Sequence, residues 1–163
     1  LTLVQTGKSP LVPIVLLDEP GGTFWKDALN FMRRQLEGNR YILPTDMRLM
    51  RLVDNAEDAA AEIDHFYSNF HSSRWLQDRF VMRMNHVLTD SAVSYMNEHF
   101  ADLCLKGRFE QQACCEMELD EPELQPLPRL SFVFNGRDHG RLRELTDFIN
   151  AKEHWASPLS AED

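Results

Sequence analysis

The stretch LVPIVLLDEPGGTFW, residues 11–25, decides the fold class of this chain. Residues 11–17 form a continuous apolar run with β-branched side chains, which is typical of a strand buried on both faces of a parallel sheet. Two glycines and Thr23, a good N-cap residue, then lead into residues 24–37, whose apolar spacing predicts a helix that ends at Gly38. Strand, turn and helix in this order indicate an α/β fold with a crossover between parallel strands.

The same pattern continues to residue 70. Residues 47–53 predict a second short strand, Asp54 and Asn55 a turn that caps a helix, and residues 56–70 that helix. The two helices are expected to bury apolar faces, formed by Phe24, Ala28, Phe31 and Met32 in the first and by Ala56, Ala60, Ile63 and Tyr67 in the second. Residues 1–70 are therefore predicted to be the C-terminal part of a doubly wound, Rossmann-like parallel sheet.

The first residues of the sequence read as the end of an element. The chain begins with Leu1 rather than Met, and LTLVQTGK, residues 1–8, has the pattern of the last turns of a helix closed by Gly7. We therefore expect the chain to start inside a domain.

Residues 71–163 follow a different pattern. The polar residues 71–78 are expected to form a linker. Within residues 79–155, alternation at 80–85 predicts a strand, Thr89 caps a helix, residues 107–118 and 128–135 predict two more strands, and residues 137–151 a last helix despite Gly140. The order β-α-β-β-α predicts a small α+β domain of the ferredoxin-like type. Residues 156–163 are expected to be a polar tail.

The composition limits the range of functions. The 163 residues carry 17 Lys and Arg against 26 Asp and Glu, which argues against a nucleic-acid partner because binding to phosphates takes clustered cations. The longest apolar run, residues 11–17, contains a proline and is far shorter than the roughly 20 residues that span a bilayer, so no membrane partner is expected. Three cysteines cannot all pair and no secretory leader is seen, which predicts a cytoplasmic protein.

The turn at residues 18–25 is the main candidate site. Phosphate-binding turns need GxxxxGK[ST] or GxGxxG, neither of which occurs here, and two carboxylates precede the glycines and would repel a phosphate. A tight strand-to-helix turn is therefore favoured over a phosphate loop. Because open α/β sheets bind ligands at the carboxyl ends of their strands, the turn is still predicted to line the rim of a substrate pocket, through Asp18, Glu19, Gly21, Gly22, Thr23 and Trp25.

Other reactive residue types give weaker signals. The cysteines at 104, 114 and 115 lack the spacing of a metal site, and we expect neither a metal nor another cofactor. His71, followed by two serines and Arg74, combines catalytic residue types, but the polarity of a linker explains them better. The acidic segment 116–128 is interpreted as a solvated face. No catalytic residue is assigned within the chain.

Residues 1–70 resemble the C-terminal third of the LOG ("lonely guy") family of Rossmann-type proteins. The segments that carry the resemblance are LTLVQTG, the strand with its LLDEP loop, the helix that ends at Gly38, the ILP segment, and the strand and helix around Asp54-Asn55-Ala56, in that order. The later residues resemble the extra C-terminal domain of a longer subgroup. Some family members are labelled lysine decarboxylases, but no lysine here stands in a setting that suggests a Schiff base.

The resemblance implies a nucleotide phosphoribohydrolase, which cleaves the N-glycosidic bond of a nucleoside 5′-monophosphate to a free base and ribose 5-phosphate. In the family, a P-G-G-x-G-T-x-x-E motif binds phosphate and ribose, and its Glu acts at the sugar. The segment EPGGT, residues 19–23, shares letters with this motif but lacks the rest of it. We therefore expect the catalytic motif to precede this chain and the fragment alone to be inactive.

Assembly and regulation leave alternatives open. Family members commonly form dimers through helices of the Rossmann sheet, so a homo-oligomer is expected, with Phe24 and Phe31 either at a subunit interface or in the core of their own chain. Alternatively, the second half is a regulatory or assembly module that binds a small effector and is not catalytic. A third interpretation is an interaction scaffold without any ligand.

Overall fold

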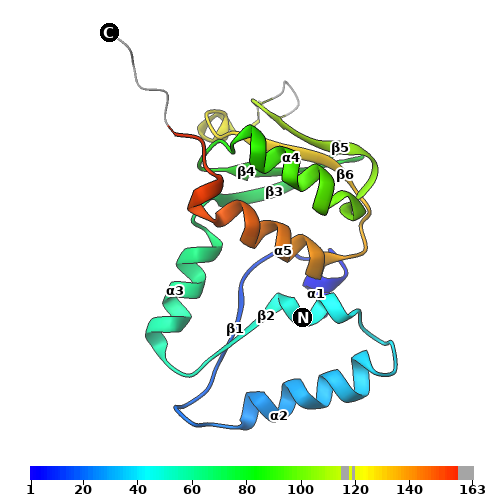
Figure 1. Cartoon of the computed structure of the whole chain (residues 1–163), viewed down its shortest axis with the longest axis vertical. Helices are drawn as coiled ribbons and strands as arrows, with labels where there is room; N and C mark the ends of the chain where they lie inside the picture. Colours follow the sequence, from blue (N-terminus) through cyan, green and yellow to red (C-terminus); the bar gives the residue numbers. More distant parts are fainter. Residues whose placement is uncertain (115–117, 119, 158–163) are drawn as a thin grey trace. The chain divides into compact units, whose positions relative to one another are not determined.

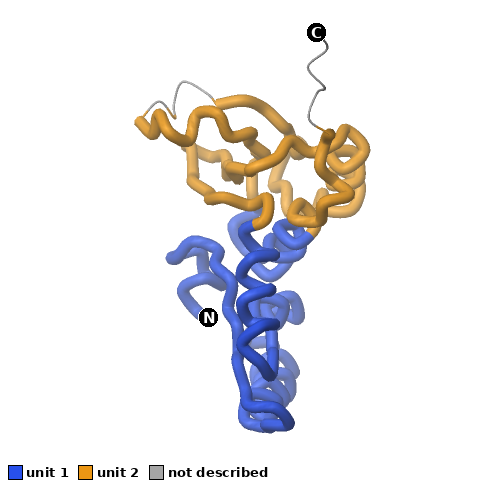
Figure 2. The backbone as a smooth tube through the Cα atoms, turned by 90° about the vertical axis from the view of Figure 1, so that its left-hand side faces the viewer, with its two compact units in different colours: residues 1–67, 135–147 blue, residues 68–134, 148–163 orange. Residues whose placement is uncertain are grey.

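The computed structural model describes residues 1–114, 118 and 120–157 (Figure 1). The chain divides into two compact units, Leu1–Tyr67 with Asn135–Asp147, and Ser68–Phe134 with Phe148–Asp163 (Figure 2). Helix α5 (His139–Asn150) begins in the first unit and ends in the second. Residues 135–147 thus contribute to the first unit, a grouping that no pattern in the sequence indicates. Among the described residues, no helix has the length and apolar character needed to cross a membrane.

The first unit contains a parallel two-stranded sheet of β1 (Ile14–Leu17) and β2 (Met50–Val53). Between these strands lie α2 (Phe24–Phe31), its π-helical continuation η1 (Met32–Glu37), and a 3-10 helix, η2 (Pro44–Leu49). Helix α1 (Thr2–Gln5) precedes β1, and α3 (Ala56–Phe66) follows β2. The α/β class and the parallel pairing are therefore confirmed, but two strands do not by themselves establish a doubly wound sheet.

Burial in α2 and β1 differs from the expected pattern. In β1 only Leu16 is buried, and Leu17 is 48% exposed. In α2 the buried residue is Leu29, whereas Phe24 and Phe31 are 69% and 55% exposed. A sheet of two strands covers only a narrow strip of a helix, so most of the apolar face predicted from helical spacing stays uncovered within this unit.

Helix α3 also turns an unexpected side to the core. Phe66 is fully buried, while Ile63 and Tyr67 from the predicted face are 44% and 42% exposed. The reason is a contact with α5, whose Arg143 guanidinium lies 4.9 Å from the centre of the Phe66 ring and also pairs with Glu62. A residue about 80 positions away therefore selects the buried side of α3.

The second unit is an antiparallel four-stranded sheet with the order β3-β4-β6-β5. Its strands are β3 (Phe70–Leu76), β4 (Arg79–Met84), β5 (Cys104–Gln112) and β6 (Arg129–Phe134), and helix α4 (Asp90–His99) packs on one face and contacts β5 (Figure 1). The expected linker at 71–78 is therefore corrected, because residues 70–76 form an edge strand. This edge strand has polar residues because much of it faces solvent.

The hairpin between β3 and β4 explains why the edge strand was missed. Its first turn residue, Gln77, has a φ of 54°. Hairpins are recognised in sequences by Asn-Gly or Gly at such positions, and Gln77-Asp78 lacks that signature. Two strands rather than one precede α4, so the element order is β-β-α-β-β-α and the expected ferredoxin-like β-α-β-β-α order is not confirmed.

The core of the second unit lies on the apolar face of its sheet. Alternation along β4 directs Phe80, Met82 and Met84 to this face, where none is more than 7% exposed. The neighbouring strand and α4 add buried side chains at Leu130, Phe132, Phe134, Ala92 and Met96. As predicted, Thr89 caps α4, since its Oγ1 accepts the N–H of Ala92 at 3.2 Å.

Two buried amides hold the start of β3 within the second unit. Asn150 Oδ1 accepts the backbone N–H groups of Asn69 at 3.1 Å and Phe70 at 2.7 Å. Asn69 Nδ2 donates to the carbonyl of Ile149 at 2.9 Å, and its Oδ1 accepts the N–H of His86 at 2.7 Å. Buried backbone groups at this junction are thereby satisfied by side chains, which fixes the first residues of the strand.

Candidate functional site

The predicted turn at residues 18–25 is organised by the carboxylate of Asp18. Its Oδ1 accepts the N–H of Glu19 at 3.0 Å and its Oδ2 accepts the N–H of Trp25 at 3.3 Å. The Asp18 N–H itself donates to the carbonyl of Val53 at 2.9 Å, which places the turn directly beyond the β1–β2 pair. Thr23, the expected cap, makes no side-chain capping hydrogen bond, so the cap of α2 comes from Asp18 instead.

This arrangement decides what the turn can bind. The N-terminus of a helix attracts an anion because its N–H groups are free, but here the carboxylate of Asp18 already occupies that position at Trp25. Gly22 leaves room for this carboxylate, since a Cβ at this residue would lie 2.3 Å from Asp18 Oδ1 and the side chain of Asp18 would have to shift. The carboxylate of Asp18 therefore takes the place that a phosphate would occupy at the start of α2. This agrees with the interpretation of residues 18–25 as a strand-to-helix turn rather than a phosphate loop.

The six predicted rim residues are placed in different ways by the structure. Asp18, Gly22 and Trp25 come together, and the Trp25 indole donates from Nε1 to the carbonyl of Leu17 at 3.0 Å. Glu19 and Thr23 are exposed, and Gly21 is exposed with a φ of 78°. Their role at a pocket rim stays a prediction.

A cleft in the first unit lies between α2 and β2. It has a volume of about 430 Å³ and includes none of the six rim residues. Its lining combines apolar side chains with three cations, and consists of Lys26, Leu29, Asn30, Arg33, Met47, Met50, Arg51 and Leu52. Cations beside an apolar floor suit an anionic molecule with an apolar part. Sequence reasoning missed this cleft because Lys26 and Arg33 look like an ordinary solvated helix face.

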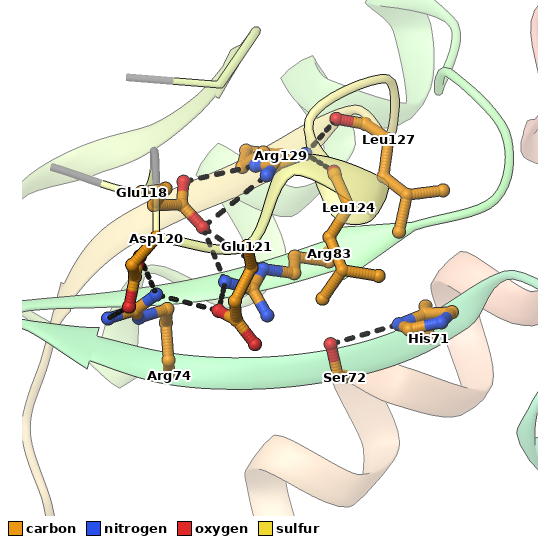
Figure 3. Close-up of polar contacts among 10 residues, drawn as sticks. All are labelled: His71, Ser72, Arg74, Arg83, Glu118, Asp120, Glu121, Leu124, Leu127 and Arg129. Atoms are coloured by element: carbon orange, nitrogen blue, oxygen red, sulfur yellow. Dashed lines mark hydrogen bonds and ion pairs between the residues drawn. The ribbon is translucent and has the colours of Figure 1, made fainter. Parts of the chain in front are cut away.

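The second unit contains a denser cluster of charged side chains (Figure 3). Register places Arg74 of β3 opposite Val81, and Arg83 of β4 opposite Arg129 of β6, so the three arginines share one face of the sheet. This face is opposite to the apolar core. The carboxylates of Glu118, Asp120 and Glu121 lie against it.

The inner part of the cluster is buried. Glu118 Oε2 accepts Arg129 Nε at 3.0 Å, and Glu118 Oε1 accepts Arg83 Nε at 3.0 Å. The side chains of Glu118 and Arg129 are fully buried and that of Arg83 is 4% exposed. Arg129 Nη1 also donates to the carbonyls of Leu124 and Leu127, so this guanidinium holds the segment that follows Glu118. Such pairs persist in a dry interior because each lone pair and N–H finds a partner.

The outer part of the cluster is open to solvent. Arg74 Nη1 donates to Asp120 Oδ1 at 3.0 Å and to Glu121 Oε2 at 2.7 Å, and Arg83 Nη2 also pairs with Glu121. The side chain of Asp120 is 62% exposed and that of Glu121 is 36% exposed. The hydrogen bond from Arg74 lowers the pKa of Asp120, and the hydrogen bond from Arg83 lowers the pKa of Glu121.

These contacts correct the interpretation of residues 116–128 as a solvated face. Glu118 is buried, and Asp120 and Glu121 are paired with arginines. Residues 116, 117 and 119 lie outside the described residues. The sequence signal was the placement of Arg79 and Arg83 on the side of β4 opposite to Phe80 and Met82, but it has meaning only once the register is known.

Among the described residues, the remaining reactive side chains do not form a catalytic set. His71 is exposed, and its Nδ1 lies 3.0 Å from Ser72 Oγ, with no carboxylate paired to it in the described part of the chain. Burial raises the pKa of the Cys104 thiol to about 11, and the Asp102 carboxylate adds to the effect, so its reactive thiolate is scarce at neutral pH. Cys115 lies outside the described residues. Within the described ranges, no group of three His, Cys, Asp or Glu residues is suited to hold a metal ion.

Comparison with known proteins gives one match. Residues 1–63 match a family model described as "possible lysine decarboxylase". No curated protein matches the chain, and no solved structure matches it. The matched residues cover β1, α2, β2 and most of α3, so the similarity concerns the first unit and supports the LOG-like resemblance at the level of the family. It does not extend to the sheet of the second unit.

Proposed function

We propose that this chain is the later part of a cytoplasmic, nucleotide-binding hydrolase that releases the free base from a nucleoside 5′-monophosphate. The observation that carries the proposal is the match of residues 1–63 to a family model whose label is shared by LOG-like proteins. The parallel β1–β2 pair with its helical crossover is consistent with that family. We place the catalytic motif in residues that precede this chain.

The chemistry supports a division of labour between this chain and the preceding residues. Cleavage of an N-glycosidic bond passes through an oxocarbenium-like transition state, which needs a nearby carboxylate and a positioned water. Asp18 is committed to capping α2, so it is not offered as the catalytic carboxylate. The turn instead contributes shape and charge at the carboxyl end of β1, where ligands of α/β sheets bind.

The charges of the turn determine which part of the substrate it would face. Asp18 and Glu19 are both acidic, and their repulsion of a phosphate places the base or the ribose, rather than the phosphate, on this side of the pocket. The side chain of Glu19 is exposed, so its carboxylate would repel the negative charge of the substrate as a whole.

The test compares this chain with a longer polypeptide that includes the preceding motif. Free base released from a panel of nucleoside monophosphates should appear only with the longer polypeptide. Within it, Glu19→Gln should lower KM by about two- to fivefold because one negative charge that repels the anionic substrate at a distance is removed, whereas Glu57→Gln on the exposed start of α3 should leave KM unchanged. Equal rates with this chain alone would refute the proposal.

We further propose that the parent protein is a homo-oligomer that uses the outer face of α2. Phe24 and Phe31 are 69% and 55% exposed, so their own unit does not bury them. Large exposed aromatic side chains on one helix are typical of a surface that another subunit covers. Of the two alternatives for these residues, this favours the interface over the core of their own chain.

A further inference from the structure

The sheet of the second unit presents an unusual concentration of arginines on one face. Arg74, Arg79, Arg83 and Arg129 all project from the side of the sheet opposite to its apolar core, as the strand register and alternation require. Four guanidinium groups thus lie on three adjacent strands, and four carboxylates, those of Glu110, Glu118, Asp120 and Glu121, pair with them. Figure 3 shows three of them directed toward the acidic residues that follow β5.

The carboxylates on this face form two layers with different accessibility. The inner layer is the buried carboxylate of Glu118 between Arg83 and Arg129, and its removal would leave the buried guanidinium of Arg129 without a carboxylate partner. The outer layer, Asp120 and Glu121 on Arg74, is in contact with solvent, where ion pairs contribute little to stability and exchange partners easily. Only the outer layer is therefore available to another anion.

We propose that Arg74, together with the Nη2 group of Arg83, is a binding site for a phosphate group, and that Asp120 and Glu121 occupy it when no ligand is bound. Three carboxylate oxygens fill the site, namely Asp120 Oδ1, Asp120 Oδ2 and Glu121 Oε2. A terminal phosphate group offers the same number of acceptor oxygens, and the guanidinium fork binds phosphate in the same bidentate manner as a carboxylate.

The inner layer gives the site its rigidity. Arg83 cannot turn away with the outer carboxylates, because its Nε and Nη2 also hold Glu118 at 3.0 and 2.9 Å. The phosphate group therefore meets one fixed guanidinium and one partly exposed guanidinium, whose side chain is 27% exposed. The second unit would then act as an effector-binding module, whether or not the first unit belongs to a hydrolase.

The experiment measures binding of inorganic pyrophosphate to the whole chain by titration calorimetry at constant ionic strength. Arg74→Gln should weaken binding at least tenfold, while Arg108→Gln, which removes an exposed arginine of the same unit, should not change it. Asp120→Asn combined with Glu121→Gln should strengthen binding at least fivefold, because the competing carboxylates are gone.

Charge alone must be separated from competition. The double variant Glu123→Gln and Glu153→Gln removes the same charge from exposed positions of the same unit, and it should bind pyrophosphate like the unmodified chain. Circular dichroism of each variant checks that the sheet is intact. The proposal is overturned if Arg74→Gln binds as well as the unmodified chain, or if the two double variants bind equally.

Discussion

At the scale of single residues, Glu118 connects two strands of the second unit, because its carboxylate binds an arginine from each of them. It accepts hydrogen bonds from both Arg83 and Arg129, and all three side chains are almost completely buried. Replacing the carboxylate by a neutral amide leaves the buried Arg129 guanidinium without its counter-charge and leaves Arg83 with Glu121 alone. The cost of breaking a buried pair in this way is about 3–5 kcal/mol.

We therefore predict that Glu118→Gln lowers the free energy of unfolding by about 3–5 kcal/mol, measured by urea denaturation. The control is Glu123→Gln, which alters an exposed carboxylate nearby and should change stability by less than about 0.5 kcal/mol. If both substitutions had equally small effects, the buried pair would not contribute to the fold.

His139 is a second residue with a measurable signature. Burial lowers its pKa, although backbone hydrogen bonds to Arg137 and Gln5 and the charges of Asp46 and Asp138 act in the opposite direction. A histidine whose folded pKa is depressed contributes stability that is complete above the ordinary value of about 6.5 and is lost as the pH falls below it.

We predict that the free energy of unfolding declines between about pH 7.5 and pH 5, and that His139→Gln makes this decline shallower. The readout is the slope against pH, which is independent of any constant loss of stability in the variant. Because burial raises the pKa of Asp46, its contribution has the opposite sign and cannot produce the decline. An identical slope in both proteins would contradict the assignment to His139.

At the scale of elements, the start of α5 depends on a close contact that outweighs helix propensity. Gly140 should weaken a helix by up to about 1 kcal/mol relative to alanine. A Cβ at this position, however, would lie 2.0 Å from the backbone carbonyl oxygen of Thr45 in the first unit. The glycine therefore permits η2 and α5 to approach each other.

We predict that Gly140→Ala destabilises the protein by more than about 1 kcal/mol, despite the better helix former, because a backbone atom must move. Thermal unfolding followed by circular dichroism measures the effect. Ser94→Ala, on the exposed side of α4, is the matched control and should be neutral or slightly stabilising. A gain in stability at Gly140→Ala would show that the contact with Thr45 is not tight.

At the scale of the whole molecule, the exposed aromatic residues of α2 predict self-association. Phe24→Ser combined with Phe31→Ser should shift the chain, or its longer parent, toward the monomer in sedimentation velocity, because apolar area is lost from the interface. Leu105→Ser, at a residue 71% exposed in the second unit, is the control and should leave the distribution unchanged. A monomer at all concentrations before any substitution would contradict the proposed oligomer.

Local patterns identified most elements correctly, because the interactions that create them span a few residues. Asn55 was predicted as a cap, and its Oδ1 accepts the N–H of Asp58 at 2.7 Å. Thr89 was identified in the same way. Strand β3 was missed because its turn at Gln77 lacks the residue type that usually marks a hairpin. Thr23 does not cap α2, because the carboxylate of Asp18, five residues earlier, accepts the N–H of Trp25 in the first turn of the helix.

The sequence by itself determined the α/β character of the first unit, its strand–turn–helix order, and the apolar face of β4, since each follows from spacing along a short segment. Only the tertiary structure decided which helix faces are buried and which charges meet. Arg83 and Glu118 are 35 residues apart, and Arg143 and Glu62 are 81 residues apart. Their pairing depends on strand register and on the packing of α5, and neither is encoded in any local pattern.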